Sequence, residues 1–247
     1  MHALAPPFSD PLPSVALLMA ADMKRVDEVI QRRLASDVAM IDQIAHYIIS
    51  AGGKRIRPML VLLFSSALGF EGNERFELAA TVEFVHTATL LHDDVVDESA
   101  LRRGRQTANA LFGNAASVLV GDFVYSRAFQ MMVSVNRMRV LEVLADATNV
   151  IAEGEVLQLM NMHDPDTTEQ RYLEVIYRKT AKLFEAGAEV AAVLAGSPEQ
   201  VRRALAAYGR HLGTAYQLVD DVLDYRSNPA ERGKNLVDYL AEGKPTL

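Results

Sequence analysis

The chain has 247 residues, of which 50% are apolar, and its 32 acidic against 25 basic side chains give a formal charge of -7 at pH 7. This charge argues against non-specific nucleic-acid binding, which needs a positive surface over the phosphates. The absence of cysteine excludes a disulfide framework, a thiolate zinc site and a cysteine nucleophile. No apolar run approaches the ~20 residues that span a bilayer, so we expect a soluble cytoplasmic protein without a transmembrane segment.

Prolines mark the beginning of the chain. Four of the nine prolines fall at positions 6, 7, 11 and 13, which predicts that residues 1–13 form a flexible N-terminal arm. From Ser14 to Leu34, apolar side chains recur at helical spacing among charged ones. This spacing predicts a surface helix with one buried stripe.

Four later segments are apolar on more than one face. They span residues 58–68, 76–96, 115–133 and 138–161 and are rich in alanine, leucine and methionine. Helices of this kind belong in the middle of a bundle. Turn-forming Gly, Asn and Pro residues separate the predicted helices, and strand-type alternation is missing. We therefore predict a single all-α domain, a helical bundle over residues 14–247.

Two stretches of the chain carry the same arrangement of three aspartates, at positions i, i+1 and i+4. On a helix, residues i and i+4 lie on one face, so the first and third carboxylates of each stretch converge. A cation must offset their repulsion, and oxygen ligands without cysteine or paired histidine favour a hard ion such as Mg²⁺. One such stretch could equally be a solvated acidic stripe, but two copies flanked by leucine and valine favour a metal site. The stretches hold Asp93, Asp94 and Asp97, and Asp220, Asp221 and Asp224.

Basic residues gather in short segments along the chain. The loop GGKRIRP at residues 52–58 runs into a predicted helix, a geometry suited to anionic oxygens, although a basic loop alone is usually just solvated. Alternating acidic and basic clusters predict a site for two phosphorylated ligands, one bridged by metal and the other held directly by Arg and Lys. The basic residues concerned are Lys54, Arg55, Arg57, Arg102, Arg103, Arg105, Lys179, Lys234 and Lys244.

Three segments carry a family resemblance, in the order GGKRIRP, EFVHTATLLHDDVVDESALRRGRQTAN and AYQLVDDVLDYRSNPAERGKN. Over roughly residues 15–247 the chain resembles the trans-polyprenyl diphosphate synthases, in particular the long-chain members that make quinone side chains. The resemblance implies a homodimeric helical bundle around a deep central cavity. It also implies Mg²⁺-dependent, head-to-tail addition of isopentenyl diphosphate to an allylic diphosphate such as farnesyl diphosphate. The expected product is octaprenyl diphosphate for ubiquinone synthesis, which passes to the membrane.

The resemblance further implies roles for individual residues. The residues expected to hold Mg²⁺ on the allylic diphosphate are Asp93, Asp97 and Asp220. Those expected to take part in catalysis beside them are Asp94, Asp221, Asp224, Arg102 and Lys179. Those expected to contact isopentenyl diphosphate are Lys54, Arg57, His86 and Arg103. Those expected to contact the allylic diphosphate are Arg102, Lys179, Thr180, Gln217, Lys234 and Lys244.

Two small residues precede the first aspartate motif by about one turn. Ala88 and Thr89 stand at i−5 and i−4 from Asp93, just below the expected metal site, where a growing chain would descend. Small side chains there predict an open channel and a long product, and Ala88→Phe is expected to shorten that product. In the alternative interpretation, Ala88 only packs against a neighbour. The polar residues interpreted as structural are His92, Glu153 and Glu155, with the alternative that the two glutamates support the residues of the site.

Two features depart from the family pattern. Asp238, a further polar position near the second motif, is followed by Tyr239 where relatives usually carry a second acid. The chain ends at Leu247, where the family continues for several helices, so we expect the C-terminal helices to be missing. The alternatives are a synthase of shorter geranylgeranyl or farnesyl diphosphate, a terpene cyclase, and a non-catalytic subunit of a heteromeric synthase. A cyclase would normally lack GGKRIRP and the second DDVLD, and non-catalytic subunits tend to lose the acidic motifs.

Overall fold

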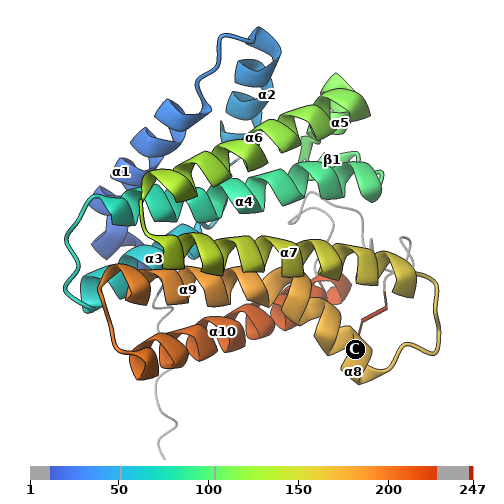
Figure 1. The fold of residues 1–247 in the computed structure, drawn as a ribbon. Helices are drawn as coiled ribbons and strands as arrows, with labels where there is room; N and C mark the ends of the chain where they lie inside the picture. Colours follow the sequence, from blue (N-terminus) through green and yellow to red (C-terminus); the bar gives the residue numbers. More distant parts are fainter. Residues whose placement is uncertain (1–11, 51, 103, 227–244, 247) are drawn as a thin grey trace, which may run out of the picture.

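The computed structural model describes residues 12–50, 52–102, 104–226 and 245–246. This part of the chain consists of helices and one short β-ribbon (Figure 1), which confirms the predicted all-α class. The helices before the ribbon are α1 (Leu12–Leu34), α2 (Ala39–Ser50), α3 (Ile56–Ala67) and α4 (Glu74–Val96). The ribbon pairs β1 (Leu101–Arg102) with β2 (Arg105–Gln106). After it come α5 (Ala108–Phe112), α6 (Asn114–Ser134), α7 (Met138–Asn161), α8 (Glu169–Ile176), a π-helix (Tyr177–Ala181), α9 (Lys182–Leu194) and α10 (Glu199–Arg226).

The helices follow the apolar periodicity closely. The four segments expected at the centre of the bundle correspond to α3, α4, α6 and α7, with ends that differ by one or two residues. Helix α1 begins at Leu12, ahead of the expected Ser14, and residues 1–11 of the predicted arm lie outside the described residues. The β-ribbon was not predicted, because its two strands have only two residues each and carry no alternating pattern.

Helix α4 runs through the middle of the bundle and packs against α1, α3, α6 and α9 (Figure 1). Its side chains Leu78, Phe84 and Leu91 are buried in the main hydrophobic core. Burying each such side chain contributes about 1.5–3 kcal/mol. The first aspartate motif follows directly in the last turn of α4, so the core fixes the position of that motif.

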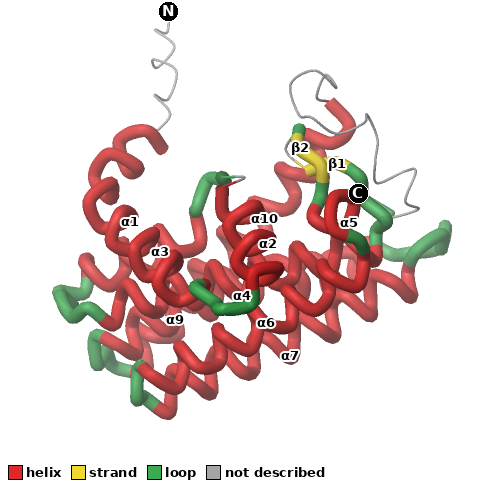
Figure 2. Tube along the Cα trace, turned by 90° about the horizontal axis from the view of Figure 1, so that it is seen from above, coloured by secondary structure: helices red, strands yellow, loops and turns green. Residues whose placement is uncertain are grey.

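Helix α10 packs most extensively against α9 and also contacts the π-helix. A second apolar cluster of Leu60, Phe184 and Ala188 joins α3 to α9 and receives side chains of α10. Helices α4 and α10 both end on the same side of the bundle, so the two aspartate motifs approach each other (Figure 1). Seen from above, the β-ribbon and α5 lie together at one end of the bundle (Figure 2). Among the described helices, none is both long and apolar enough to cross a membrane.

Candidate active site

A cavity of about 360 Å³ lies where the C-terminal ends of α4 and α10 approach each other. Its lining comes from α3, α4, α7, α8, the π-helix and α10, so segments far apart in the sequence meet there. The spacing of the two aspartate motifs in the sequence does not show that they face one site, whereas the structure brings both to one cavity. The predicted site residues in its lining are Arg57, His86, Thr89, Asp93, Asp97, Arg102, Lys179, Thr180, Gln217, Asp220, Asp221 and Asp224.

The buried Asp94 is not part of this lining and binds Arg102 of β1 instead. Arg102 Nε and Nη2 lie 2.8 and 2.7 Å from the same Oδ1 atom of Asp94. Burial acts to lower the pKa of Arg102, but the Asp94 carboxylate outweighs it and raises that pKa, so the guanidinium stays charged. The amide of Asn109 donates to the backbone carbonyl of Asp94 at 3.0 Å and ties α5 to the end of α4. Asp94, expected among the catalytic residues, therefore positions a cation at the cavity.

A chain of hydrogen bonds fixes the Asp221 carboxylate of the second aspartate motif. The Thr180 hydroxyl donates to Gln217 Oε1 at 2.9 Å, and Gln217 Nε2 donates to Asp221 Oδ1 at 2.7 Å. The Tyr172 hydroxyl of α8 donates to the other carboxylate oxygen of Asp221. Burial raises the pKa of Asp221, and the neighbouring Asp220 adds to that, while the two hydrogen bonds act in the opposite direction. Tyr172 was missed in the sequence because it is a single aromatic in a short helix.

Lys179 lies on the π-helix, and its side chain contacts two residues of α7. Its Nζ atom is 2.5 Å from Glu155 Oε2, 2.8 Å from Gln158 Oε1 and 3.6 Å from Asp93 Oδ2. Burial acts to lower the pKa of Lys179, but Asp93 and Glu155 outweigh it and raise that pKa, so Lys179 stays charged. Burial raises the pKa of Glu155 to about 7 against the effect of Lys179. Glu155 lines the cavity and contacts Lys179, which agrees with the alternative interpretation that it supports the site.

The GGKRIRP loop contributes one of its three cations to the cavity lining. Arg57 Nη1 lies 3.2 Å from His86 Nε2, and its guanidinium stacks over the Phe184 ring at 4.5 Å from the centroid. Because a guanidinium only donates, His86 Nε2 accepts and its proton is on Nδ1. Arg55 instead pairs with Glu83 of α4 at 3.1 Å. Lys54 is exposed and does not line the cavity, so its contact with isopentenyl diphosphate stays a prediction.

A second cavity of about 420 Å³ lies between α4, α6 and α7, and the surface of its wall is mostly apolar although half of its lining residues are polar or charged. It shares part of its lining with the first cavity, so the two are adjacent. The shared residues are Thr89, Asp93, Asp97, Glu155 and Gln158. A charged cavity beside an apolar one suits a ligand with an anionic head and an apolar tail.

The two residues expected to set product length, Ala88 and Thr89, have different surroundings in the structure. Thr89 lines both cavities. Ala88 is completely buried in the main core and lines neither cavity. Successive residues on a helix point about 100° apart, so only one of these neighbours faces the cavities. The contacts of Ala88 therefore agree with the alternative interpretation, in which it packs against core neighbours.

The carboxylates of the first cavity are suited to a metal that also binds phosphate. Among the described residues, no group of three or more His, Cys, Asp or Glu is placed to hold a metal ion alone. Mg²⁺ typically takes one or two carboxylates and completes its shell with phosphate oxygens and water, so the aspartates of this lining fit a hard divalent cation beside a diphosphate. The predicted residues that lie outside the described residues are Arg103, Lys234, Asp238, Tyr239 and Lys244.

Comparisons with known proteins agree with this geometry. The polyprenyl synthetase family model matches residues 38–247. The chain is 60% identical over 230 residues to the octaprenyl diphosphate synthase of Escherichia coli K12, which covers 93% of this chain and 71% of that protein. It is 59% identical to the octaprenyl diphosphate synthase of Haemophilus influenzae, with coverage of 92% and 69%.

Solved structures show the same fold. A decaprenyl diphosphate synthase from Rhodobacter capsulatus superposes with a TM-score of 0.90 at 51% identity, over 96% of this chain and 73% of that one. A polyprenyl synthase from Caulobacter crescentus, complexed with calcium and isoprenyl diphosphate, gives a TM-score of 0.94 at 50% identity, over 98% and 74%. The chain therefore belongs to the polyprenyl synthetase family of divalent-metal-dependent trans-prenyltransferases.

Proposed function

We propose that this chain adds isopentenyl diphosphate units head-to-tail to an allylic diphosphate such as farnesyl diphosphate and makes octaprenyl diphosphate for ubiquinone side chains. The observation that carries this proposal is the pair of adjacent cavities. The charged cavity is lined by carboxylates of both aspartate motifs and by three cations, and the apolar cavity continues from it past Thr89. High identity to octaprenyl diphosphate synthases supports the product length.

The allylic diphosphate is assigned to the aspartate side of the charged cavity. Asp93, Asp97 and Asp220 would hold Mg²⁺, which, when bound, neutralises charge that develops on the leaving diphosphate. Arg102 and Lys179 lie in the same lining and offer N–H donors to phosphate oxygens. Because the reaction breaks a carbon–oxygen bond by stabilising a leaving group, it needs no side-chain nucleophile, in agreement with the absence of cysteine.

Isopentenyl diphosphate is assigned to the Arg57 and His86 side. Their 3.2 Å hydrogen bond and the stacking of Arg57 on Phe184 hold the guanidinium in one orientation. A fixed guanidinium recognises diphosphate oxygens with little loss of side-chain entropy. The apolar lining of the second cavity would receive the prenyl tail and keep water from the carbocation.

A homodimer is supported by an apolar surface on two neighbouring helices. Leu119 and Val133 of α6 are 67% and 62% exposed, and Val156 and Met160 of α7 are 58% and 71% exposed. If these side chains form one contiguous surface, they would mark an interface, because large exposed apolar patches commonly do. Sedimentation equilibrium would test the dimer, and cell fractionation would test the predicted cytoplasmic location and the handover of product to the membrane.

The experiment that tests the function measures product length. Purified protein is incubated with Mg²⁺, farnesyl diphosphate and radiolabelled isopentenyl diphosphate, and the dephosphorylated products are separated by chromatography. We expect octaprenol as the main product, and no product when EDTA replaces Mg²⁺ or when Asp93 is changed to Asn. A geranylgeranyl product would support the shorter-chain alternative, and absence of extended product from folded protein would refute the synthase.

A further inference from the structure

The ammonium group of Lys179 has more than one carboxylate partner. Two of its neighbours belong to α7, Glu155 at 2.5 Å and Gln158 at 2.8 Å, and the third is Asp93 of α4 at 3.6 Å. An ammonium has three N–H donors. Glu155 and Gln158 occupy two of them, so one donor remains to face the cavity beside Asp93.

The backbone brings α7 unusually close to the segment that carries Lys179. A Cβ atom added at Gly154 would lie 2.7 Å from Arg178 Cβ and 2.8 Å from the backbone nitrogen of Lys179. The absence of a side chain at Gly154 thus allows the two helices to touch. Residues 177–181 form a short π-helix between α8 and α9, and π-helical turns often occur at functional sites. Both features bring Lys179 within reach of Glu155, the residue that follows Gly154 on α7.

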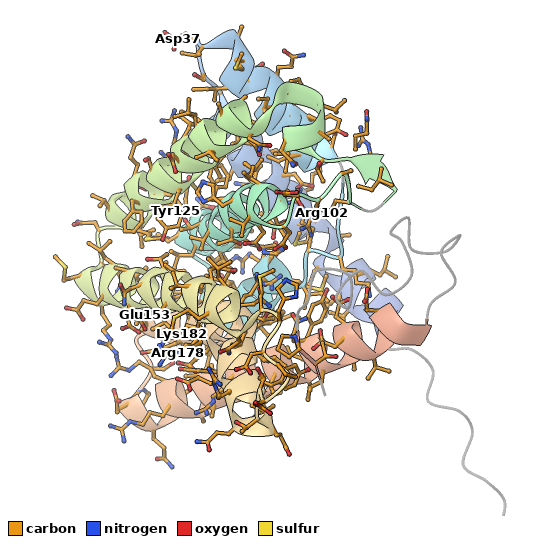
Figure 3. The ribbon with its side chains drawn as sticks, turned by 90° about the vertical axis from the view of Figure 1, so that its right-hand side faces the viewer. Asp37, Arg102, Tyr125, Glu153, Arg178 and Lys182 are labelled. Carbon is orange, nitrogen blue, oxygen red and sulfur yellow. The ribbon has the colours of Figure 1, made fainter. Side chains whose placement is uncertain are left out.

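The two acidic residues around Gly154 face different surroundings. Glu155 lines both cavities and contacts Lys179. Glu153 is 53% exposed and pairs with Arg178 at 2.5 Å, on the outer side of α7 (Figure 3). The chain therefore offers an internal comparison, two glutamates on one helix of which one touches the site.

From this arrangement we infer that Glu155 and Gln158 are positioning residues that hold the Lys179 ammonium on α7 and keep it from pairing fully with Asp93. Among the described residues, Asp93 is the one other carboxylate within 4 Å of Lys179 once the Glu155 carboxylate is removed. Lysine then moves toward Asp93 and competes there with the divalent cation. This inference rests on the proposed function, because it assigns the cation to Asp93 and a diphosphate oxygen to the remaining donor of Lys179.

The test measures metal binding directly. Mn²⁺ is titrated into the folded protein with inorganic pyrophosphate, and free Mn²⁺ is followed by electron paramagnetic resonance. Glu155→Gln is expected to weaken Mn²⁺ binding about tenfold, the range seen when a residue that orients metal ligands is replaced. Glu153→Gln, the matched control, is expected to bind Mn²⁺ as the unchanged chain does. Equal effects of the two substitutions, or no effect of Glu155→Gln, would overturn the inference.

A double-mutant cycle separates positioning from a direct effect of the Glu155 charge on the metal. If Glu155 acts through Lys179, Glu155→Gln costs little further Mn²⁺ affinity in a Lys179→Met background. A tenfold loss in both backgrounds would instead assign Glu155 directly to the metal and refute the positioning role. The exchanged pair Glu155→Gln with Gln158→Glu, which returns a carboxylate to Lys179, should recover most of the binding.

The result of the Mn²⁺ binding experiments can be interpreted independently of the product-length assay. If the unchanged chain makes no polyprenyl diphosphate while the Mn²⁺ cycle shows coupling between Glu155 and Lys179, the proposed function fails and the positioning role stands. If the chain makes the product and the cycle shows no coupling, only the positioning role fails.

Discussion

The close contact of α10 with the π-helix leads to a quantitative prediction at Gly213. A Cβ atom there would lie 2.6 Å from Ala181 Cα and 3.1 Å from Ala181 Cβ, whereas ordinary contact begins at 3.4 Å. Backbone cannot yield as a flexible side chain does, so Gly213→Ala must push α10 away by about 0.8 Å. Gln217, one turn further along α10, donates to Asp221 and accepts from Thr180 at 2.9 Å.

A displacement of that size would break the link between the two walls of the site. The Thr180–Gln217 distance would rise to about 3.7 Å, outside the range of a hydrogen bond. Because misplacement of a site by about 1 Å can cost 10²-fold in rate, we expect kcat/KM for isopentenyl diphosphate incorporation to fall 10- to 100-fold. The free energy of unfolding should fall by only about 0–2 kcal/mol, since overpacking costs about 1–3 kcal/mol while alanine gains about 1 kcal/mol of helix propensity over glycine.

The assay compares initial rates and thermal unfolding for Gly213→Ala with those for His211→Ala, an exposed position on the same helix. His211→Ala should leave the rate unchanged. An unaltered rate in a folded Gly213→Ala protein would refute the reasoning, because it would show that the position of α10 does not depend on this contact. A large loss of stability together with activity would also refute it, since the expected effect is a shift of the site and not unfolding.

Three further predictions concern residues that hold or border the site. Asp94→Asn removes the charge that holds Arg102, and we expect at least a tenfold fall in kcat/KM measured by incorporation; a normal rate would contradict the positioning of that cation. Tyr172→Phe leaves one oxygen of the buried Asp221 carboxylate without its donor and should lower the free energy of unfolding by about 1–3 kcal/mol in urea titrations; unchanged stability would count against this contact. Thr89→Phe should shorten the product seen by chromatography, because Thr89 lines both cavities, and an unchanged product would disprove that path for the chain.

Much of this architecture could be predicted because its signals are local. Helices α4 and α7 are long, apolar on more than one face and free of proline, so their type and approximate ends follow from the local sequence. The convergence of Asp93 with Asp97 follows in the same way, because it depends only on helical geometry. The meeting of the two aspartate motifs in one cavity depends instead on how α4 and α10 pack, and here the family resemblance was needed.

The residues that sequence reasoning missed act through contacts between distant segments. Glu155 is one of two glutamates beside a glycine, and only the packing of α7 on the π-helix distinguishes it from Glu153. Asp94 is predicted as a site residue from the first aspartate motif, but only the packing of the β-ribbon shows that it pairs with Arg102 and does not line the cavity. Local pattern gives the residue types of the site, while tertiary packing decides which of them reach the cavity.

Two glycines that sequence analysis passes over bring two helices of the site against one segment of the chain. Gly154 allows α7, and Gly213 allows α10, to touch the segment 178–181 from two directions. That segment carries Lys179, which contacts α7 and Asp93, and Thr180, which contacts α10. The positions of both aspartate motifs therefore depend on contacts with the same short segment, residues 178–181. A change in either contact should therefore alter the separation of the motifs, and with it the fit of a metal-bound diphosphate, before it unfolds the bundle.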